Sequence, residues 1–477
     1  MKNWKRLFSV ENLLSLANNH NGILIVVIVG IIFVMTRLMY YQFPLMHPDY
    51  GNHLLIIRYL RKGYLPYKEF SLTHMPGLYV LMFFGTLVFG STLGSLLVYL
   101  VVVSLVFPLF FTYLKNAFSS SLLASLGIIL LLTDALFTIY TKVATFDCLA
   151  LVFILPVLII CQQKKISKHD YFLLTGLFFI SLFIKITTVY FFGFYFGSQI
   201  FFAIFQRKSF QEKLKASCLL LVTVSVVFLG LNWLWPEIFT DIFESHLLRP
   251  AMPLSERLIN IWRVFFVSPI ILLGLLSSII FCFFPPKDKR IRFLPIFFLF
   301  FLLFSVFIPR NFYQHHLIFL LPIGVELVIL LTLRLGGFIL RRSHFWKVLI
   351  SVLGAVALVS HFTKWVIFLS VDNHGVKRIY SQVKEKEGQL YASSNFHYIA
   401  VGKEPSFEYF ATIPDGPCRW GKSCDEHKKN LAKADYALID NWVYRHIGDE
   451  NFHKYLYENF YLEEYDRFSG LKFYMRR

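Results

Sequence analysis

The polar stretch from His47 to Pro76 lies between two long apolar runs and holds the residues best suited to chemistry. Its middle, His53 to Lys62, has the pattern of a short amphipathic helix with cations on one face, and such a helix is expected to lie in a membrane interface. Asp49 precedes this predicted helix, close to its positive N-terminal end. One carboxylate beside cations such as Arg58 suggests chemistry on an anionic lipid.

Two further ionisable residues interrupt the apolar sequence. Lys185 lies between the runs FFISLFI and ITTVYFFGF, where an ammonium group is unfavourable unless it has an anionic partner or a water-filled cavity. Asp147 follows a polar segment and enters an apolar run. It either orients a substrate or forms a structural ion pair with Lys142, five residues away. The residues alone leave both alternatives open.

The composition indicates a polytopic α-helical membrane protein. Of 477 residues, 56% are hydrophobic and only 16% are charged, and several apolar runs exceed the roughly 18 residues that cross a bilayer. The first run is too long for a signal-peptide core and is expected to be retained as a span. The sequence predicts about eleven spans, near residues 22–43, 77–114, 120–138, 148–161, 171–184, 188–205, 216–235, 264–284, 293–308, 316–333 and 346–370. Because 77–114 is longer than one span needs, a re-entrant or interfacial piece is expected after Pro76.

The net charge of +18 follows membrane topology rather than nucleic-acid binding. Residues 1–370 hold 31 Lys and Arg against 13 Asp and Glu, whereas residues 371–477 hold 16 of each. The excess gathers in short loops, for example at Lys164, Lys165 and Lys168, as the positive-inside rule expects of cytoplasmic loops. The sequence therefore predicts an inner-membrane protein with its N-terminus inside and its C-terminus outside. The polar loops that can build a site face the exterior or periplasm.

Residues 371–477 differ from the rest of the chain in composition. They are polar and alternate short β-rich runs with helical ones, which predicts a small soluble α/β domain on the outer face. Two domains are thus expected, a transmembrane domain over 1–370 and an extracytoplasmic domain over 371–477. Cys418 and Cys424 are the only cysteines of the second domain, and they form either a disulfide in an oxidising compartment or two unpaired thiols.

Four segments together resemble a known enzyme family. They are the first polar loop, HPDYG with its continuations GYLPYKEF and THMPGLY; TKVATFD; FIKITTVY; and PRNFYQHHLIFLLP. The pattern, over roughly residues 20–335, resembles the polyprenyl-phosphate-sugar-dependent glycosyltransferases of the GT-C fold, in particular the bacterial membrane enzymes related to protein O-mannosyltransferases and lipid A aminoarabinose transferases. A helical bundle followed by a small outer domain fits the same fold. Protein O-mannosyltransferases carry adjacent acids in the first loop, whereas Tyr50 follows Asp49 here, so a paired-acid mechanism is not expected.

The resemblance implies transfer of a hexosyl or pentosyl group from a polyprenyl-phosphate donor to an acceptor hydroxyl at the outer face. Asp49 would take the proton of the attacking hydroxyl, a role worth about 10²–10⁴ in rate. Cations would stabilise the charge that develops on the departing phosphate in a water-poor site. The candidates for this second role are Lys185, Arg58, Arg310 and Lys142. The candidates for contacting or orienting the acceptor are Asp147, His53 and Tyr313.

The same resemblance names the partners. They are the lipid-linked sugar donor, the membrane lipids, and an acceptor that is a lipid, a polysaccharide or a protein; nucleic acid is not expected. The predicted outer loops hold several histidines, but none has the strong HExxH ligand spacing, so hydrogen bonding at the interface is preferred and no metal ligand is predicted. A divalent cation as cofactor is left open.

Each candidate residue also has a structural interpretation. Asp49 would cap the helix expected to begin near Gly51, a role compatible with that of a base. Arg61 and Lys62 are better explained as ligands of anionic lipid headgroups than as site residues. Lys185 would extend its ammonium group to the membrane interface instead of binding a phosphate.

The rival function from another class is a transporter or flippase of a lipid-linked sugar. Transporters tend to contain internal repeats and polar or broken helices near the middle of the membrane. No internal duplication is evident in the sequence, and its ionisable residues cluster at one predicted face. A glycosyltransferase is therefore the preferred prediction.

Overall fold

The structure is a computed structural model that describes residues 21–40, 48–68, 74–90, 92–141, 144–163, 166–206, 210–238, 242, 251–286, 288, 291–309, 314–339, 374–393, 395–403, 425–440, 450–466 and 470–477. The chain divides into two compact units. We call residues 1–37, 99–229 and 252–366 the helical unit, and residues 38–98, 230–251 and 367–477 the mixed unit. The mixed unit resumes close to the predicted border at 370/371 but also includes two earlier segments. The two-domain assignment stays a prediction.

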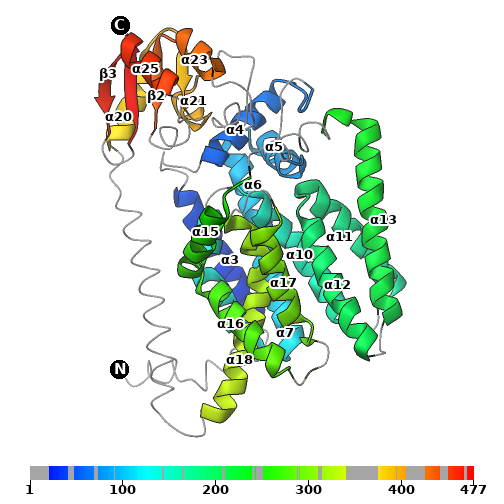
Figure 1. Ribbon diagram of the computed structural model, residues 1–477. Coiled ribbons are helices and arrows are strands. Elements are labelled where there is room, and N and C mark those ends of the chain that lie inside the picture. The colour runs from blue at the N-terminus through cyan, green and yellow to red at the C-terminus, as the bar shows by residue number, and fades with distance from the viewer. Residues whose placement is uncertain are drawn as a thin grey trace. The chain divides into compact units, whose positions relative to one another are not determined.

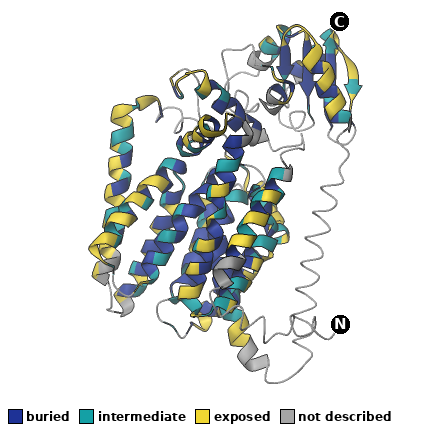
Figure 2. Cartoon of the chain, turned by 180° about the vertical axis from the view of Figure 1, so that it is seen from behind, coloured by how far each residue is buried: buried dark blue, intermediate teal, exposed yellow. Residues whose placement is uncertain are grey.

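The helical unit is an assembly of helices that run side by side (Figure 1). Its helices are α3 (Asn21–Tyr40), α6 (Thr92–Ser104), α7 (Val106–Phe118), α8 (Ser121–Thr133), α9 (Ala135–Thr141), α10 (Phe146–Gln162), α11 (Lys168–Ile184), α12 (Thr188–Gln206), α13 (Phe210–Leu234), α15 (Leu254–Val267), α16 (Pro269–Phe283), α17 (Leu294–Phe307), the 3₁₀ helix η2 (Gln314–Leu320) and α18 (Leu321–Ile339). Of these, α3, α6 and α13 belong partly to each unit. In Figure 2 buried residues line the inside of this assembly and exposed residues recur along its outward faces.

Three helices of the described chain are long and apolar enough to cross a membrane, namely Gly94–Phe118, Leu214–Leu234 and Gln314–Leu335. The number rises to five if two bent helix pairs each count as one span. Further apolar helices are shorter, and the last predicted span, 346–370, lies outside the described residues. The predicted number of about eleven spans therefore stays a prediction. The long run 77–114 is divided among α5 (Gly77–Phe89), α6 and α7, and α5 ends at Gly90 in a left-handed conformation with φ of +68°.

Side-chain caps explain where several helices begin. Ser120, Thr145 and Ser268 precede α8, α10 and α16, and each side-chain oxygen accepts a hydrogen bond from the backbone N–H three residues later. Ser167 and Asp170 form a reciprocal capping box at the start of α11. These polar groups fix the ends of helices whose interiors carry little local sequence information, because nearly every interior residue is apolar.

Two helix breaks in the helical unit are joined by one hydrogen bond. The axis bends by 64° between α8 and α9 and by 101° between α15 and α16. Asp134, at the first break, accepts hydrogen bonds from the backbone N–H groups of Leu136 (3.0 Å) and Phe137 (3.3 Å). Ser268, at the second break, donates its hydroxyl to the other oxygen of Asp134 at 2.6 Å. The sequence predicts one continuous span over 120–138, and the helix instead ends at Asp134 because this side chain starts a new one.

The mixed unit contains a four-stranded sheet with helices around it. Its helices are α4 (Pro48–Arg61), α5, α20 (His374–Glu385), α21 (Asn395–Val401), α23 (Asp425–Ala432) and α25 (Glu450–Asn459). Its strands are β1 (Leu390–Ala392), β2 (Tyr436–Ile439), β3 (Phe460–Tyr465) and β4 (Lys472–Arg476), in the spatial order β1-β2-β4-β3. β1 and β2 are parallel, with Leu390 opposite Tyr436, and the other pairs are antiparallel. The helices between β1 and β2 supply the crossover that a parallel pair requires.

A buried polar chain lies beyond the ends of β1 and β2. His397 of α21 is hydrogen-bonded through Nδ1 to the Tyr380 hydroxyl at 2.9 Å and through Nε2 to Asp440 at 3.0 Å. Burial raises the pKa of Tyr380 well above its ordinary value, and the charge of Asp440 raises it further. The phenol therefore keeps its proton and donates a hydrogen bond to Nδ1, while Nε2–H donates a hydrogen bond to the Asp440 carboxylate.

Candidate functional site

An ion pair between Asp147 and Lys185 forms the centre of the candidate site in the helical unit. Lys185 Nζ lies 2.5 Å from Asp147 Oδ1, and the two side chains are 11% and 3% exposed. Asp147 is in the first turn of α10, where the positive helix end favours a carboxylate. Lys185 is the C-cap residue of α11, between α11 and α12. The anionic partner that an ammonium group in an apolar run requires is therefore Asp147, 38 residues earlier in the chain.

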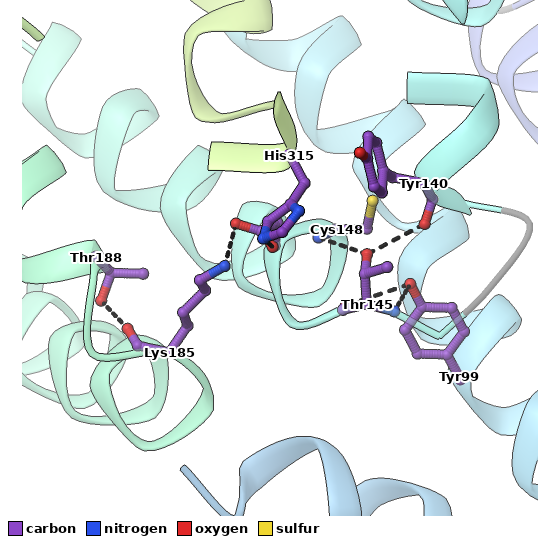
Figure 3. A network of polar contacts seen from close by, with 8 residues as sticks. Tyr99, Tyr140, Thr145, Cys148, Lys185, Thr188 and His315 are labelled. Carbon is purple, nitrogen blue, oxygen red and sulfur yellow. Dashed lines mark hydrogen bonds and ion pairs between the residues drawn. The ribbon is translucent and has the colours of Figure 1, made fainter. Parts of the chain in front are cut away.

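His315 is the third side chain of the site. It lies in the first turn of η2, and its Nε2 is 3.8 Å from Asp147 Oδ2 (Figure 3). Its side chain is 26% exposed, more than either member of the ion pair. The rings of Tyr140 and His316 contact it edge to face, with centroids at 5.3 Å and 4.7 Å. We call Asp147, Lys185 and His315 the Asp147 site.

A hydrogen-bond network around Thr145 fixes the start of α10 and therefore Asp147. The Thr145 backbone N–H donates to the Tyr99 hydroxyl at 3.0 Å, and the Thr145 hydroxyl donates to the Tyr140 carbonyl at 3.1 Å. The same hydroxyl accepts a hydrogen bond from the backbone N–H of Cys148 at 3.5 Å (Figure 3). Tyr99 and Tyr140 belong to α6 and α9, so three helices converge on one threonine.

Aromatic residues that follow Lys185 and His315 in the sequence pack against one another. Thr188 donates its hydroxyl to the Lys185 carbonyl at 2.8 Å, which closes the turn into α12. Phe191, one turn further, contacts the rings of Phe301 at 5.5 Å and Phe319 at 5.9 Å edge to face. These contacts link α12 to α17 and to η2. Close-packed aromatic rings resist displacement, so the turn at Lys185 and the turn at His315 are held in a fixed relation.

The site combines one carboxylate with two basic groups. An ammonium group has three N–H donors, and among the described residues Asp147 is the one hydrogen-bond partner of Lys185 Nζ. Two donors therefore remain for a ligand. Asp147 also fixes the orientation of the ammonium group. Because Lys185 and His315 are partly exposed, a ligand can approach both side chains. This arrangement suits an anionic ligand with several oxygen atoms, such as a phosphate.

The other predicted site residues of the mixed unit lie on α4. The helix begins at Pro48, so Asp49 is in its first turn rather than before it, and the Asp49 side chain lies outside the described residues. Arg58 Nη1 donates to the Lys403 carbonyl at 3.0 Å, and the 4% exposed His53 contacts the Tyr79 ring with centroids at 5.5 Å.

The apolar face of α4 is buried by protein. Leu54 and Leu55 are 2% exposed and Tyr59 is 7% exposed, and the helix contacts both α5 and α21. Protein therefore covers the face that the sequence analysis assigns to a membrane interface. The helix α21, more than three hundred residues later in the chain, was not recognisable as its partner from periodicity alone.

Several predicted residues lie outside the described part of the chain. They are Lys142, Arg310, Tyr313, Cys418 and Cys424, and their predicted roles stay predictions. Within the described residues, no group of three or more His, Cys, Asp or Glu side chains is placed to hold a metal ion.

Two buried arginines of the helical unit were missed by the sequence analysis. Arg37 at the end of α3 is 5% exposed, lies over the Phe33 ring at 4.5 Å and donates to the Thr141 hydroxyl at 3.4 Å. Arg257 of α15 is 8% exposed and donates to the carbonyls of Val306 (3.2 Å) and Phe307 (3.1 Å) at the end of α17. For Arg37 the signal was available, because an arginine within a predicted span is costly unless protein groups bind it. Arg257 lies in a polar stretch before the predicted span 264–284, so no such signal was present for it.

Comparison with known structures identifies the fold. The chain superposes on the crystal structure of ArnT from Cupriavidus metallidurans bound to undecaprenyl phosphate with a TM-score of 0.62 and 11% identity, covering 95% of this chain and 97% of that chain. For ArnT from the same organism in the apo state, the TM-score is 0.61 with 13% identity over 95% and 97%. No protein-family model and no curated protein sequence matches the chain. The predicted GT-C fold is confirmed at the level of the fold.

Proposed function

We propose that this chain is a membrane glycosyltransferase that moves a sugar from a polyprenyl-phosphate donor to an acceptor hydroxyl. The fold supports this proposal, because it is shared with ArnT, a lipid A aminoarabinose transferase crystallised with undecaprenyl phosphate. A sequence identity of 11% supports a shared fold but not a shared substrate, so the reaction has to be inferred from this chain's own residues.

The Asp147 site is the single observation that carries the proposal. Lys185 is a cation between two apolar helices, oriented by a buried carboxylate and with ammonium donors left for a ligand. A lipid phosphate meets this need, because its headgroup is anionic and its chain is apolar. When the sugar leaves, the phosphate gains charge, and a preorganised ammonium in a water-poor site stabilises that charge most effectively. Asp147 orients Lys185, and His315 is placed to contact the donor or the acceptor.

Asp49 is proposed as the base. The acceptor oxygen attacks the anomeric carbon, the bond between that carbon and the phosphate oxygen breaks, and the hydroxyl proton passes to the Asp49 carboxylate. The phosphate departs with both bonding electrons. Asp49 lies in the first turn of α4, and the N-terminal end of a helix favours a negatively charged group.

The finer topology belongs to the same proposal. We propose that transfer takes place at the outer face of the inner membrane, with the N-terminus inside, about eleven spans, and residues 371–477 outside as a small α/β domain. The acceptor is a lipid, a polysaccharide or a protein that presents a hydroxyl group at that face. Arg58, Arg310 and Lys142 are proposed as further cations for the donor, although the guanidinium of Arg58 is already bound to the Lys403 carbonyl.

The test is sugar transfer from a polyprenyl-phosphate sugar by the purified protein in detergent. Asp49→Asn should lower turnover at least about a hundredfold while donor binding stays nearly intact, because the amide cannot accept the proton. Asp170→Asn, a change at an exposed acid in another part of the chain, is the matched control and should leave turnover unchanged. Retained activity in Asp49→Asn excludes this residue as the base. Weakened donor affinity alone moves it to a positioning role.

One observation favours the rival function. The helix pairs α8–α9 and α15–α16 are bent by 64° and 101°, and discontinuous helices are common in transporters. Reconstitution into vesicles with a fluorescent lipid-linked sugar separates the two functions. Movement of the lipid between leaflets without any sugar transfer would support a flippase, and transfer to an acceptor supports the glycosyltransferase.

A further inference from the structure

Glu326 is a completely buried acid in the middle of an apolar helix. It lies on α18, within the candidate span Gln314–Leu335, and it is 0% exposed. Its Oε2 atom accepts a hydrogen bond from the hydroxyl of Tyr113 on α7. The transfer mechanism proposed above does not use this residue.

The hydrogen bonding around Glu326 is incomplete. Its Oε1 atom is buried and has no hydrogen-bond partner among the described residues. The same is true of Gln199 Oε1 on α12. Tyr195, also on α12, is hydrogen-bonded to Gln199 and lies within electrostatic range of Glu326 and Tyr113. We call Glu326, Tyr113, Tyr195 and Gln199 the Glu326 site.

No cation faces Glu326 from the described elements around it. The titratable groups within electrostatic range of Glu326 and Tyr113 are Tyr195 on α12, Cys161 on α10 and Asp288 in the segment between α16 and α17. Of the other helices that contact α18, α8 and α17 have no titratable residue and α16 has only Cys282, which is exposed. The helix η2 also contacts α18, and its histidines, His315 and His316, precede Glu326 by eleven and ten residues. The cations on α7 and α18 themselves, Lys115 and Arg334, are exposed. No cation is among the groups within electrostatic range of Glu326.

An ionised carboxylate is therefore poorly supported at this position. Removing a carboxylate from water is costly, and the cost is repaid only by a cation or by several hydrogen-bond donors. Glu326 has one described donor, the Tyr113 hydroxyl, and its second oxygen has none. A proton on Oε1 removes the charge and leaves Oε2 as a carbonyl oxygen that accepts from Tyr113, which satisfies the observed contact.

We propose that the Glu326 site is an intramembrane proton-binding site, in which Glu326 holds a proton at neutral pH. The carboxylate takes up one proton from solvent and its charge changes from −1 to 0, with no other bond made or broken. Because α18 continues directly from η2, which carries His315, the neutral acid keeps α18 packed against α7 and thereby helps to position the Asp147 site. The proposal does not depend on the transfer reaction.

Infrared spectroscopy of the full-length protein in detergent tests this proposal directly. The difference spectrum between wild type and Glu326→Gln should contain the C=O stretching band of a protonated carboxyl group at about pH 7. A solvated Glu side chain, with a pKa of about 4.3, is ionised at that pH and gives no such band. Tyr113→Phe should shift this band, because the C=O group loses its hydrogen bond. Asp170→Asn is the matched control, since the band of its exposed acid should appear only under acidic conditions.

Other outcomes overturn the proposal. A difference spectrum with only carboxylate bands at about pH 7 means that Glu326 is ionised. A carboxyl band that disappears when Na⁺ is added assigns the site to a metal cation instead of a proton. Should Glu326→Gln fail to fold, labelling of wild type by dicyclohexylcarbodiimide gives the same answer, because this reagent reacts with protonated carboxyl groups in apolar surroundings. Absence of label on Glu326 at neutral pH then contradicts the proton-binding site.

Discussion

The Asp147 site and the Glu326 site are two acidic sites in one bundle with opposite surroundings. Asp147 is paired with Lys185 and faces His315, and both basic side chains are partly exposed. Glu326 is fully buried, and its described hydrogen-bond partner is a phenol. Helix α10 has Asp147 in its first turn and Cys161, which faces the Glu326 site, in its last, about 21 Å apart at 1.5 Å per residue.

This difference determines which of the two acids can take part in ionic chemistry. A carboxylate with a cation beside it stays charged and can hold that cation in place for an anionic ligand. A carboxylate without a cation in an apolar bundle gives up its charge by binding a proton. The groups that contact each acid therefore distinguish a site for charged ligands from a site for a proton.

The largest expected effect comes from replacing each of these two acids by its amide, which should change stability very differently at the two sites. Asp147→Asn leaves the Lys185 ammonium without its anionic partner, which should destabilise the folded protein by about 3–5 kcal/mol and lower sugar transfer about a hundredfold or more. Glu326→Gln exchanges one neutral group for another, so it should cost no more than about 1–2 kcal/mol. Thermal unfolding and donor turnover, measured on both variants in the same detergent, check the comparison.

A double variant tests whether the loss comes from the unpaired charge. Asp147→Asn combined with Lys185→Met removes both charges and should recover most of the stability lost in Asp147→Asn, while sugar transfer stays low. If the double variant is no more stable than Asp147→Asn, the ion pair is not the source of the effect. Equal losses in Asp147→Asn and Glu326→Gln would remove the distinction between the two sites.

Binding of lipid phosphate gives the next largest effect. Lys185→Met keeps the length and apolarity of the side chain, so it should preserve folding and even improve thermal stability without donor. Wild type should gain about 2.7 kcal/mol from polyprenyl phosphate at a hundred times its dissociation constant, and the variant should lose that gain. The measurement is the shift of the unfolding temperature on adding lipid. If the lipid stabilises the variant as well as it does wild type, Lys185 is not its ligand and Arg58 or Arg310 becomes the leading candidate.

The sequence was most informative where one residue conflicts with its surroundings. Lys185 in an apolar run required an anionic partner, and the structure provides Asp147. The identity of that partner was not predictable, because proximity in sequence pointed from Asp147 to Lys142, whereas the observed pair joins the start of α10 to the end of α11. Pairing across helices depends on which helix ends meet, and periodicity does not contain that information.

The helix breaks were hidden for a related reason. The residues around Asp134 are apolar on both sides, so the hydropathy pattern predicts an uninterrupted span. The break depends on Asp134 capping α9 and on the Ser268 hydroxyl, 134 residues later, that binds its second oxygen. The general fold was accessible, because apolar runs and charged loops set the class, and the resemblance in four short segments indicated the GT-C arrangement.

The Asp134–Ser268 hydrogen bond gives a smaller effect that extends the comparison to a third acid. Ser268→Ala removes one hydrogen-bond donor from the buried carboxylate of Asp134, which should destabilise the protein by about 1–3 kcal/mol. Ser277→Ala is the control, because that hydroxyl bonds the Leu273 carbonyl within its own helix. Urea or thermal unfolding compares the two variants. Equal stability of Ser268→Ala and Ser277→Ala would mean that the link between the helix breaks contributes nothing.

The smallest effect is expected at an acid that solvent surrounds. Asp170 lies at the surface, and its carboxylate accepts hydrogen bonds from the Ser167 hydroxyl and backbone N–H, both at 2.7 Å. The Ser167 hydroxyl is the first cause of a lowered pKa at Asp170, so the folded state favours the ionised form. Because the pKa of Asp170 is lower in the folded state, its ionised form stabilises the folded protein above the ordinary pKa of 3.8. This stabilisation is lost as the pH falls through the folded-state pKa.

Hydrogen exchange at the first turn of α11 measures that contribution without requiring global unfolding. Asp170→Asn should speed exchange of these amides at neutral pH by a few-fold, and acidification should make wild type resemble the variant once intrinsic exchange rates are taken into account. Global stability should change little, because solvent screens an exposed charge. A loss of global stability as large as that of Asp147→Asn would show that exposure does not determine the effect of an acid in this protein. The contrast among paired, buried and exposed acids would then have to be replaced by one based on helix position.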